Sequence, residues 1–507
     1  MYMNDHKVLR NSLSMMAVTM FSLSANALDK PQTMDDMWKI IQAQQQQLNE
    51  MKSRLEKAES KSTVVSVQPA NLPASDSKSP IEIKDSTSLA TSSQGTQPQT
   101  ANNQVKKLER KTDILSQEVE KLRTNLAIPE EKQLKSAYGM GPAASKVYQV
   151  GKGLSIGGYG EGFYQNIVGD KGTEKSKADM ERMVVYVGYK FTDSIIMNSE
   201  LEFEHGSTGE GAESKGEVSA EFVSLDFLLN PKVNVRTGLV LMPMGLINRM
   251  HEPLFYFGNH RPMVEQTIIP STWSEMGVGL FGAITPNLTY TTYAVNGLNA
   301  SGFSSIGVKE GKGGGSQALA QDLGYVARLD YTPDALPGLT VGGSGYISNS
   351  GQDLTYNSQK ANVLTQIYES HLQWKYYGLE FRALGSWGLI NNADLLSAQN
   401  IFAGNGQGVV GSQNYGWYTE AGYDVLPLMF KDTPQYLAPF VRYEKLNTIA
   451  KAPLGYPTDP TKDQEVFQVG LQYKPIPQVV LKADYRNFVA KQGSLPDDFN
   501  LGFGFIF

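Results

Sequence analysis

Leu501-Gly502-Phe503-Gly504-Phe505-Ile506-Phe507 is the stretch that decides the fold. Large apolar side chains occupy its odd positions, and two glycines with one isoleucine occupy its even positions. Successive side chains of a β-strand point to opposite faces, so one face is aromatic and the other mainly small. Such a strand suits a wall between lipid and a filled or watery interior. The terminal strand of a soluble β-sandwich is the alternative.

The same alternation recurs upstream, with charges on one face. Strands with one apolar and one polar side fit a sandwich with its apolar face inward, or a pore with lipid outside and water inside. Alternation alone does not separate the two. The clearest examples are 200–204, 233–239, 328–331, 379–383, 467–474 and 479–486.

Sixteen candidate strands follow residue 150, from 153–165 to 499–507, and 277–285 has the weakest pattern. Bacterial single-chain barrels have even strand numbers and alternate short turns with long loops, as this chain does. We predict an all-β fold, a 16-stranded antiparallel transmembrane β-barrel over residues 151–507. An N-terminal helical coiled-coil extension is expected before it.

Residues 1–27 have the order of a secretory signal peptide. Lys7 and Arg10 precede an apolar stretch, and Ala25-Asn26-Ala27 is a small-residue cleavage site. A buried N-terminal helix is the alternative. The chain has no cysteine, so disulfides, thiolate chemistry and Cys-ligated zinc are excluded, and we expect no cofactor and no metal. A net charge of −6 argues against nucleic acid as a partner.

Residues 28–150 lack strand-like alternation. Apolar residues spaced three and four apart predict coiled-coil helices at 28–59 and 105–128, although two helices folding back on each other would show similar spacing. Residues 60–104 are rich in Ser, Thr, Pro and Gln and predict a disordered linker. Residues 129–150 are expected to be a second linker.

Residues 246–275 are too long for a turn, and their prolines bar a central strand. We predict a loop that folds into the barrel and narrows it, with an external loop packed on a neighbouring subunit as the alternative. The loop also carries His260. Its predicted constriction residues are Asn248, Arg249, His251, Glu252, Arg261 and Glu265.

Charged residues on the polar faces of the strands are the predicted pore lining. A field of mixed sign would orient dipolar solutes and exclude apolar ones. The basic members are Arg236, Arg328, Arg382, Arg442, Lys482 and Arg486, and the acidic members are Glu200, Glu202, Glu204, Asp330, Glu380 and Asp484.

Signals for an enzyme are weak. Residues 277–282 match G-x-G-x-x-G, but a strand rather than a helix follows, which argues against a dinucleotide site. His251 and Glu252 lack metal-site spacing. Ser370 and His371 are the sole adjacent Ser-His pair after the signal, and neighbours on a strand point to opposite faces. We therefore expect no catalytic residues.

One segment resembles a characteristic stretch of the phosphate-selective porin O and P family. It contains Asn230-Pro231-Lys232, Gly238, Met242-Pro243-Met244-Gly245, His251-Glu252-Pro253, Arg261-Pro262, Val264-Glu265, Ile268-Ile269-Pro270, Trp273 and Glu275. The likeness covers roughly residues 150 to 507, and the helical extension is similar to that of DcaP-like trimeric porins. A final strand ending in Phe507 also resembles the assembly signal of Gram-negative outer-membrane barrels.

The resemblance implies a homotrimer and passive diffusion of small solutes through a 16-stranded barrel. It does not imply phosphate, because the family's arginine ladder and lysine cluster cannot be mapped onto this chain. We expect a porin in the outer membrane of a Gram-negative bacterium, with its extension in the periplasm. Its partners would be lipid, its own copies and small hydrophilic solutes. One alternative is a barrel-anchored tether whose coiled coil binds peptidoglycan or a periplasmic protein, and a barrel enzyme is another.

Overall fold

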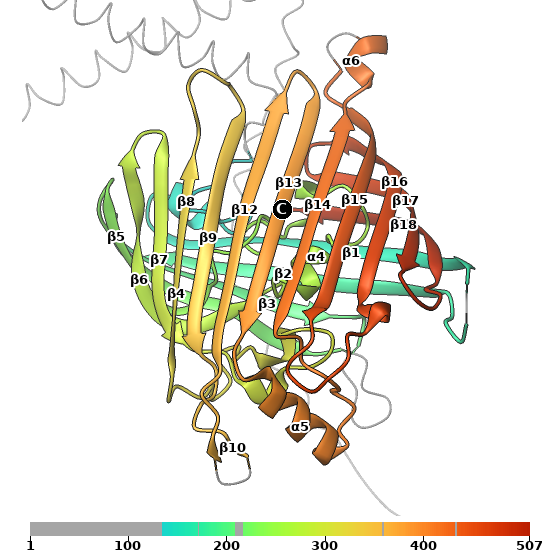
Figure 1. Cartoon of the computed structure of the whole chain (residues 1–507). Helices are drawn as coiled ribbons and strands as arrows, with labels where there is room; N and C mark the ends of the chain where they lie inside the picture. The colour runs from blue at the N-terminus through green and yellow to red at the C-terminus, as the bar shows by residue number, and fades with distance from the viewer. Residues whose placement is uncertain (1–133, 171, 208–215, 357–358, 431–432) are drawn as a thin grey trace, which may run out of the picture. The chain divides into compact units, whose positions relative to one another are not determined.

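The computed structural model describes residues 134–507, apart from 171, 208–215, 357–358 and 431–432 (Figure 1). The predicted signal peptide, coiled-coil helices and disordered linker lie outside the described residues, and these assignments stay predictions. In the part of the chain that is described, no helix is long and apolar enough to cross a membrane.

Sixteen strands close into one antiparallel barrel, in which each strand pairs with its neighbours along the chain and the first pairs with the last. This confirms the predicted barrel, including the weakest strand. The strands are β1 Gly153–Gly169, β2 Lys177–Lys190, β3 Ile195–Glu204, β4 Val218–Asn230, β5 Val233–Leu241, β6 Ser274–Thr285, β7 Leu288–Asn296, β8 Leu323–Tyr331, β9 Leu339–Asn349, β12 Leu364–Tyr376, β13 Leu379–Ile390, β14 Gln413–Tyr423, β15 Tyr436–Lys451, β16 Asp463–Ile476, β17 Val479–Ala490 and β18 Asp497–Ile506.

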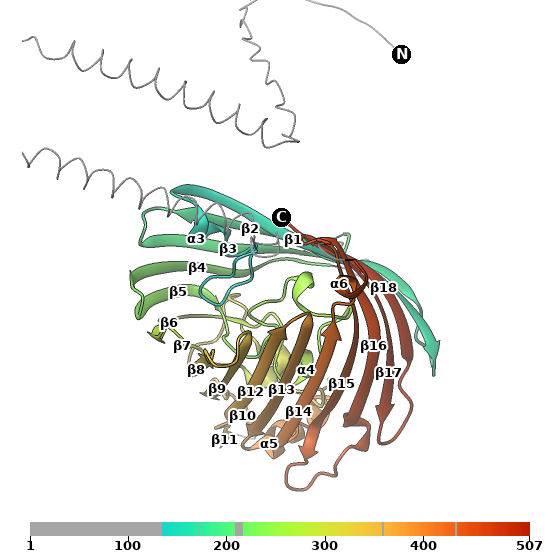
Figure 2. The same cartoon turned by 90° about the horizontal axis from the view of Figure 1, so that it is seen from above.

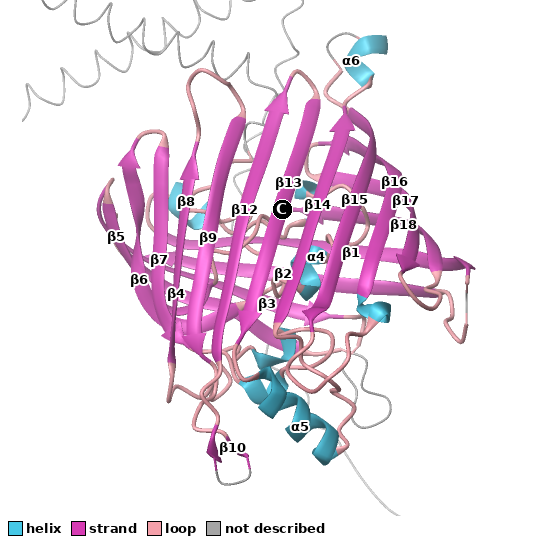
Figure 3. Ribbon diagram, viewed as in Figure 1, coloured by secondary structure: helices cyan, strands magenta, loops and turns pink. Residues whose placement is uncertain are grey.

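The remaining elements are short and lie in the connections (Figure 3). A separate hairpin joins β10 Thr355–Tyr356 to β11 Gln359–Lys360. The α-helices are α3 Lys146–Gln149, α4 Val264–Thr267, α5 Ala393–Ala403 and α6 Leu426–Met429. The 3₁₀ helices are η3 Pro253–Phe255, η4 Ala300–Gly302, η5 Lys309–Gly311 and η6 Pro460–Lys462.

The two ends of the barrel differ in their connections. At the turn end, where β1 begins and β18 finishes, most strands are joined by short turns such as 231–232 and 377–378. At the loop end the connections are longer, and they include 297–322 and 391–412. This is the arrangement of short turns and long loops that the sequence predicts.

The outward side chains of the strands are mainly apolar, and many of the inward side chains are polar or charged, as the alternation predicts. On β3, Leu201 is exposed whereas Glu200 and Glu202 are buried. On β18, Phe503 is exposed whereas Asn500 is fully buried. The wall therefore has an apolar outer face and an inner face that carries charged residues together with buried aromatic ones.

The seam between β1 and β18 joins the glycines of one strand to the aromatic residues of the other. Gly160 pairs with Phe505, and the backbone of Gly158 exchanges two hydrogen bonds with Phe507, at 3.0 and 2.9 Å. A Cβ atom at Gly158 or Gly160 would collide with the ring of Phe507 or Phe505. The rings of β18 thus lie over the glycine surface of β1.

Residues 134–150, which we call the strap, differ from the linker expected there. Met140, Ala143, Ala144 and Val147 are almost fully buried and form one face of the strap. That face packs with Tyr159 and other inward aromatic residues of β1, β2 and β4. The strap is ordered because this apolar face is buried inside the barrel, where the neighbouring strands leave room for it.

A second apolar cluster fills the interior toward the loop end. Trp273, Phe303, Tyr346 and Tyr418 are among its most buried members, and they come from both strands and loops. Together with the strap, this cluster gives the barrel an internal core of packed side chains.

Candidate functional site: the barrel interior

Residues 242–273, which we call the inward segment, connect β5 to β6 and lie within the ring of strands (Figure 2). Their backbone is held by inward side chains of distant strands. Lys482 donates to the carbonyl of Gly258 at 2.9 Å, and Gln472 donates to that of Tyr256 at 2.9 Å. The segment therefore crosses the interior to β16 and β17, as an inward loop would.

Glycines on the final strand make room for this segment. A Cβ atom at Gly504 would lie 2.6 Å from Cβ of Pro253, and one at Gly502 would collide with the side chain of Asn259. The small face of residues 501–507 thus faces the inward segment rather than open water.

Two of the predicted constriction residues shape the segment itself, and Asn248 is the first. It donates to the carbonyls of Met242 and Trp273, at 2.8 and 3.0 Å, and accepts from the Trp273 amide at 2.7 Å. Its side chain therefore clamps the two ends of the segment together.

Glu265 holds the middle of the segment. Its carboxylate accepts the amides of Leu246 and Ile247, at 2.8 and 2.7 Å, and the Tyr418 hydroxyl at 2.6 Å. Burial raises the pKa of Glu265 above its usual range.

The other predicted constriction residues, except Arg261, join the segment to its surroundings. Arg249 forms an ion pair with Asp330 at 3.0 Å, and His251 lies 2.9 Å from Glu200. Arg261 stays within the segment and donates to the Ser271 hydroxyl at 2.7 Å. His260 meets Phe163 of β1 edge to face, with ring centroids 4.6 Å apart.

Glu252 points to the strap. Its carboxylate accepts the amides of Ala143 and Ala144, at 3.0 and 3.4 Å. Burial raises the pKa of Glu252 to about 7. Burial would lower the pKa of His251, but the adjacent Glu200 carboxylate outweighs it and leaves that pKa raised. The pKa of His260 falls to about 4 because of burial and the nearby Arg486.

The twelve charged residues predicted to line the pore all lie on inward positions of the strands, and nine of them are buried. Glu204, Asp330 and Glu380 keep partial exposure. The side chain of Glu200, for example, is 0% exposed. In the described structure these groups mostly contact one another, the inward segment or the strap.

Their nearest partners include several residues that sequence reasoning missed. Asp226 pairs with Arg236 at 2.7 Å, and Glu420 lies between Arg382 and Arg442. Glu161 and Glu202 both reach Arg182, at 3.0 and 3.2 Å.

Six of these inward residues form a continuous row across β13 to β18, which we call the charge belt. Adjacent members are directly opposite in the strand register, so each lies one strand spacing from the next. Arg442 donates to Gln468 at 2.8 Å, and Arg486 donates to Asp498 at 2.9 Å. The members are Arg382, Glu420, Arg442, Gln468, Arg486 and Asp498.

The residues of the weak enzyme motifs at 277–282 and 370–371 lie in barrel strands. Residues 277–282 lie within β6 and pair with both neighbouring strands. Ser370 faces outward, while His371 faces inward between Glu369 and Asp330, each at 2.9 Å. Among the described residues, no group of three or more His, Cys, Asp or Glu is placed to hold a metal ion.

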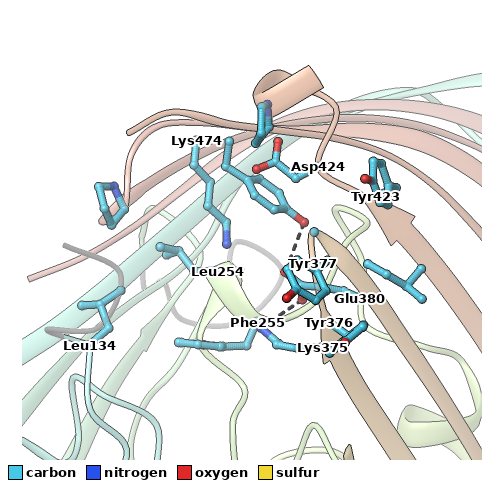
Figure 4. A pocket seen from close by; sticks show the side chains of 15 residues that line it. Leu134, Leu254, Phe255, Lys375, Tyr376, Tyr377, Glu380, Tyr423, Asp424 and Lys474 are labelled. Atoms are coloured by element: carbon cyan, nitrogen blue, oxygen red, sulfur yellow. Dashed lines mark hydrogen bonds and ion pairs between the residues drawn. The ribbon is translucent and has the colours of Figure 1, made fainter. Parts of the chain in front are cut away.

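A cavity of about 880 Å³ opens at the turn end (Figure 4). Its lining includes Leu134 of the strap and Phe255 of the inward segment. Glu380 in its wall pairs with Lys375 at 3.0 Å and accepts the Tyr436 hydroxyl at 3.2 Å. Both internal segments thus reach this cavity, which we call the vestibule and whose mainly aromatic and apolar lining carries four charged residues, Lys375, Glu380, Asp424 and Lys474.

An apolar outer face, a charged inner face and complete strand closure define the class of membrane-spanning β-barrels. No protein-family model matches the chain. An uncharacterized protein of Aquifex aeolicus (strain VF5) is 37% identical over 372 residues, which are 72% of this chain and 82% of that protein. The chain therefore belongs to the same family as this Aquifex aeolicus protein.

Several solved outer-membrane proteins have a similar arrangement at low sequence identity. Salmonella typhi OmpF in complex with daunomycin is 13% identical, with a TM-score of 0.46, over 70% of this chain and 98% of that one. DcaP of Acinetobacter baumannii is 11% identical, with a TM-score of 0.42, over 70% and 97%. The anion-selective porin of Comamonas acidovorans is 10% identical, with a TM-score of 0.43, over 70% and 99%. At these values the likeness carries no argument about activity.

Proposed function

We propose that the chain is an outer-membrane channel of the porin type, which passes small hydrophilic or charged solutes by diffusion. The observation that carries the proposal is the division of the wall into an apolar outer face and a charged inner face. A barrel that only anchored a partner would need the first face but not the second. The vestibule at the turn end, which carries Lys375, Glu380, Asp424 and Lys474 in its lining, supports an entry route for charged solutes.

In this proposal the inward segment is the constriction. Arg249 and Asp330 pair beside it and keep 19% and 15% of their side-chain surface exposed. They are the charged groups that a solute would meet beside the constriction. Charges of both signs attract dipolar solutes and repel apolar ones.

The proposal also covers the location and the oligomeric state of the channel. Residues 151–507 are the barrel domain, and the barrel lies in the outer membrane of a Gram-negative bacterium as a homotrimer. The helical extension predicted before residue 129 lies in the periplasm. The chain needs no cofactor and catalyses no reaction.

Planar-bilayer recording of the refolded full chain under a salt gradient tests the function. Conductance steps in groups of three support an open trimeric channel, and the sign of the reversal potential tells which charge governs passage. A heat-modifiable, folded barrel that carries no current contradicts the proposal.

One observation favours a second candidate function, a barrel-anchored tether. Buried, mutually paired charges and an apolar cluster fill much of the described interior. A tether needs no open route, and its predicted coiled coil would bind peptidoglycan or a periplasmic protein. Deletion of residues 28–128 separates the two functions. A porin keeps its conductance after this deletion, whereas a tether loses its attachment to isolated cell wall.

A further inference from the structure

The strap crosses the turn-end mouth of the barrel. Leu134 at one end of it lines the vestibule, and the other end leads into β1 at Gly153. Between these points Tyr138 packs edge to face on Phe281 of β6, with ring centroids 5.3 Å apart. The strap therefore spans the inner wall from β6 to β1.

Glycines in the wall and in the strap leave the space in which the strap packs. A Cβ atom at Gly188 of β2 would lie 2.6 Å from Cβ of Val147, and one at Gly157 of β1 would lie 2.7 Å from the Ala143 carbonyl. Within the strap, a Cβ atom at Gly141 would collide with the Glu252 carboxylate. Larger residues at these positions would leave no room for the strap.

Polar bonds join the strap to both the wall and the inward segment. Lys190 of β2 donates to the Val150 carbonyl and Arg236 of β5 donates to the Tyr148 hydroxyl, each at 3.2 Å. Asn198 donates to the Ala144 carbonyl at 2.9 Å, and Tyr148 donates to Asp226 at 2.8 Å. From the inward segment, Arg249 donates to the Gly139 carbonyl at 3.1 Å, and Glu252 accepts two strap amides.

We propose that the strap is a releasable internal cover, which docks across the turn-end mouth and limits passage until it leaves the inner wall. The proposal rests on the proposed channel function. Release would expose Asp226, Arg236 and Glu252, the charged groups that the strap now covers or binds. The chain before Leu134 continues directly into the strap. A pulling force on that part of the chain would therefore be transmitted to the strap.

The test compares release of the strap with conductance in the full chain. The chain has no cysteine, so Ala144→Cys introduces a single thiol, which we call the reporter thiol, at a position that is 4% exposed. In this background Gly188→Leu pushes on Val147 from the wall. Gly151→Leu is the matched control, because a Cβ atom there meets nothing within 4 Å.

A second release variant, Arg249→Ala with Glu252→Ala, removes the bonds to the inward segment without adding bulk. Each protein is refolded, checked for heat-modifiable migration, treated with a water-soluble maleimide and recorded in a planar bilayer. We expect Gly188→Leu to make the reporter thiol reactive and to raise single-channel conductance several-fold, while Gly151→Leu changes neither.

The other outcomes overturn the proposal in distinguishable ways. A reactive reporter thiol with the conductance of the parent protein means that the strap is not a cover. Protection of the reporter thiol in both release variants means that the strap is a fixed part of the barrel. Absence of current from every form, the parent included, removes the channel function and the role of the strap together.

Discussion

The inward segment and the strap both lie inside the barrel, but they are secured differently. The inward segment is joined to a strand at each end, and its backbone bonds to β8, β15, β16 and β17. The strap joins a strand at one end only and is otherwise held by its apolar face and by side-chain bonds to the wall and the inward segment. One interior therefore holds a segment anchored to strands at both ends and a strap anchored to a strand at one.

The largest effect is expected from Glu265→Ala in the fixed segment. Two buried amides and one hydroxyl would lose their acceptor, and unsatisfied buried groups cost about 1–3 kcal/mol each. We expect the inward segment to become sensitive to protease in the folded barrel. Gln266→Ala is the neighbouring control, since its side chain bonds only the carbonyl of Arg261. Equal resistance of Glu265→Ala and the control would show that the carboxylate does not fix the segment.

Removing the charges of two inward arginines, Arg236 and Arg382, should change the ion selectivity of the channel rather than the stability of the inward segment. Arg236→Gln with Arg382→Gln removes two inward cations and leaves Asp226 and Glu420 in place. We expect the reversal potential to move toward cation preference. An unchanged reversal potential would mean that these charges do not face the route of the solute. Lys445→Gln, which lies in an ion pair on the exposed outer side, is the control.

Docking of the strap should weaken as the pH rises. Burial in the folded barrel raises the pKa of Glu252 from the usual 4.5 to about 7, and the strap, which covers this carboxyl, contributes to that burial while its two amides oppose the rise. The docked state then binds its proton more tightly, so this contribution is complete below about pH 4.5 and lost by about pH 7. We expect the reporter thiol to be more accessible at about pH 8 than at about pH 5, by about 1–2 kcal/mol in docking free energy. Labelling of a fully exposed cysteine, introduced by Gly151→Cys, corrects for the pH dependence of the thiol reaction itself.

Glu252→Gln isolates that contribution, because it removes the titrating group at the contact with the two strap amides. His251 beside it pairs with Glu200 of the wall and stays unchanged in this variant. The glutamine variant should lose most of the pH dependence. A pH profile identical to that of the parent protein would assign the effect to other groups.

The smallest effect is expected from Tyr148→Phe. It removes the hydroxyl that bonds Asp226 and receives a bond from Arg236, at 2.8 and 3.2 Å. A loss of about 1 kcal/mol would raise the labelling rate of the reporter thiol about fivefold. Tyr138→Phe is the control, because Tyr138 contributes ring contacts on the exposed side of the strap. No increase in labelling beyond this control would show that the hydroxyl does not secure the strap.

Much of the wall could be predicted from the sequence, because alternation is local. Charges such as Glu200 and Arg382 face inward as their strand neighbours required, and all sixteen strands were found. The charge belt could not be found in this way. Glu420 meets Arg382 and Arg442 through the register of three strands, and the long connection 391–412 hides that register from the sequence.

The interior was harder to predict for two reasons. Alternation shows which face is polar but not whether water or protein meets it, so the packing around Arg236 and Glu200 was not foreseen. The sequence predicts a linker over the strap because residues 129–150 lack strand-like alternation. The spacing of Met140, Ala143, Ala144 and Val147, three, one and three apart, is the helical signal that could have revealed it.

The seam between β1 and β18 has a consequence for the order of folding. It joins residues that are more than 330 apart in the chain, such as Gln165 and Asp498. Contacts so distant in sequence are expected to form late in folding. The inward segment is the connection between β5 and β6, so it is already attached to both strands before the seam closes. We expect closure of the seam to be the slowest step, with the segment already inside. Larger residues at Gly158 or Gly160 would therefore prolong the life of an open, aggregation-prone precursor.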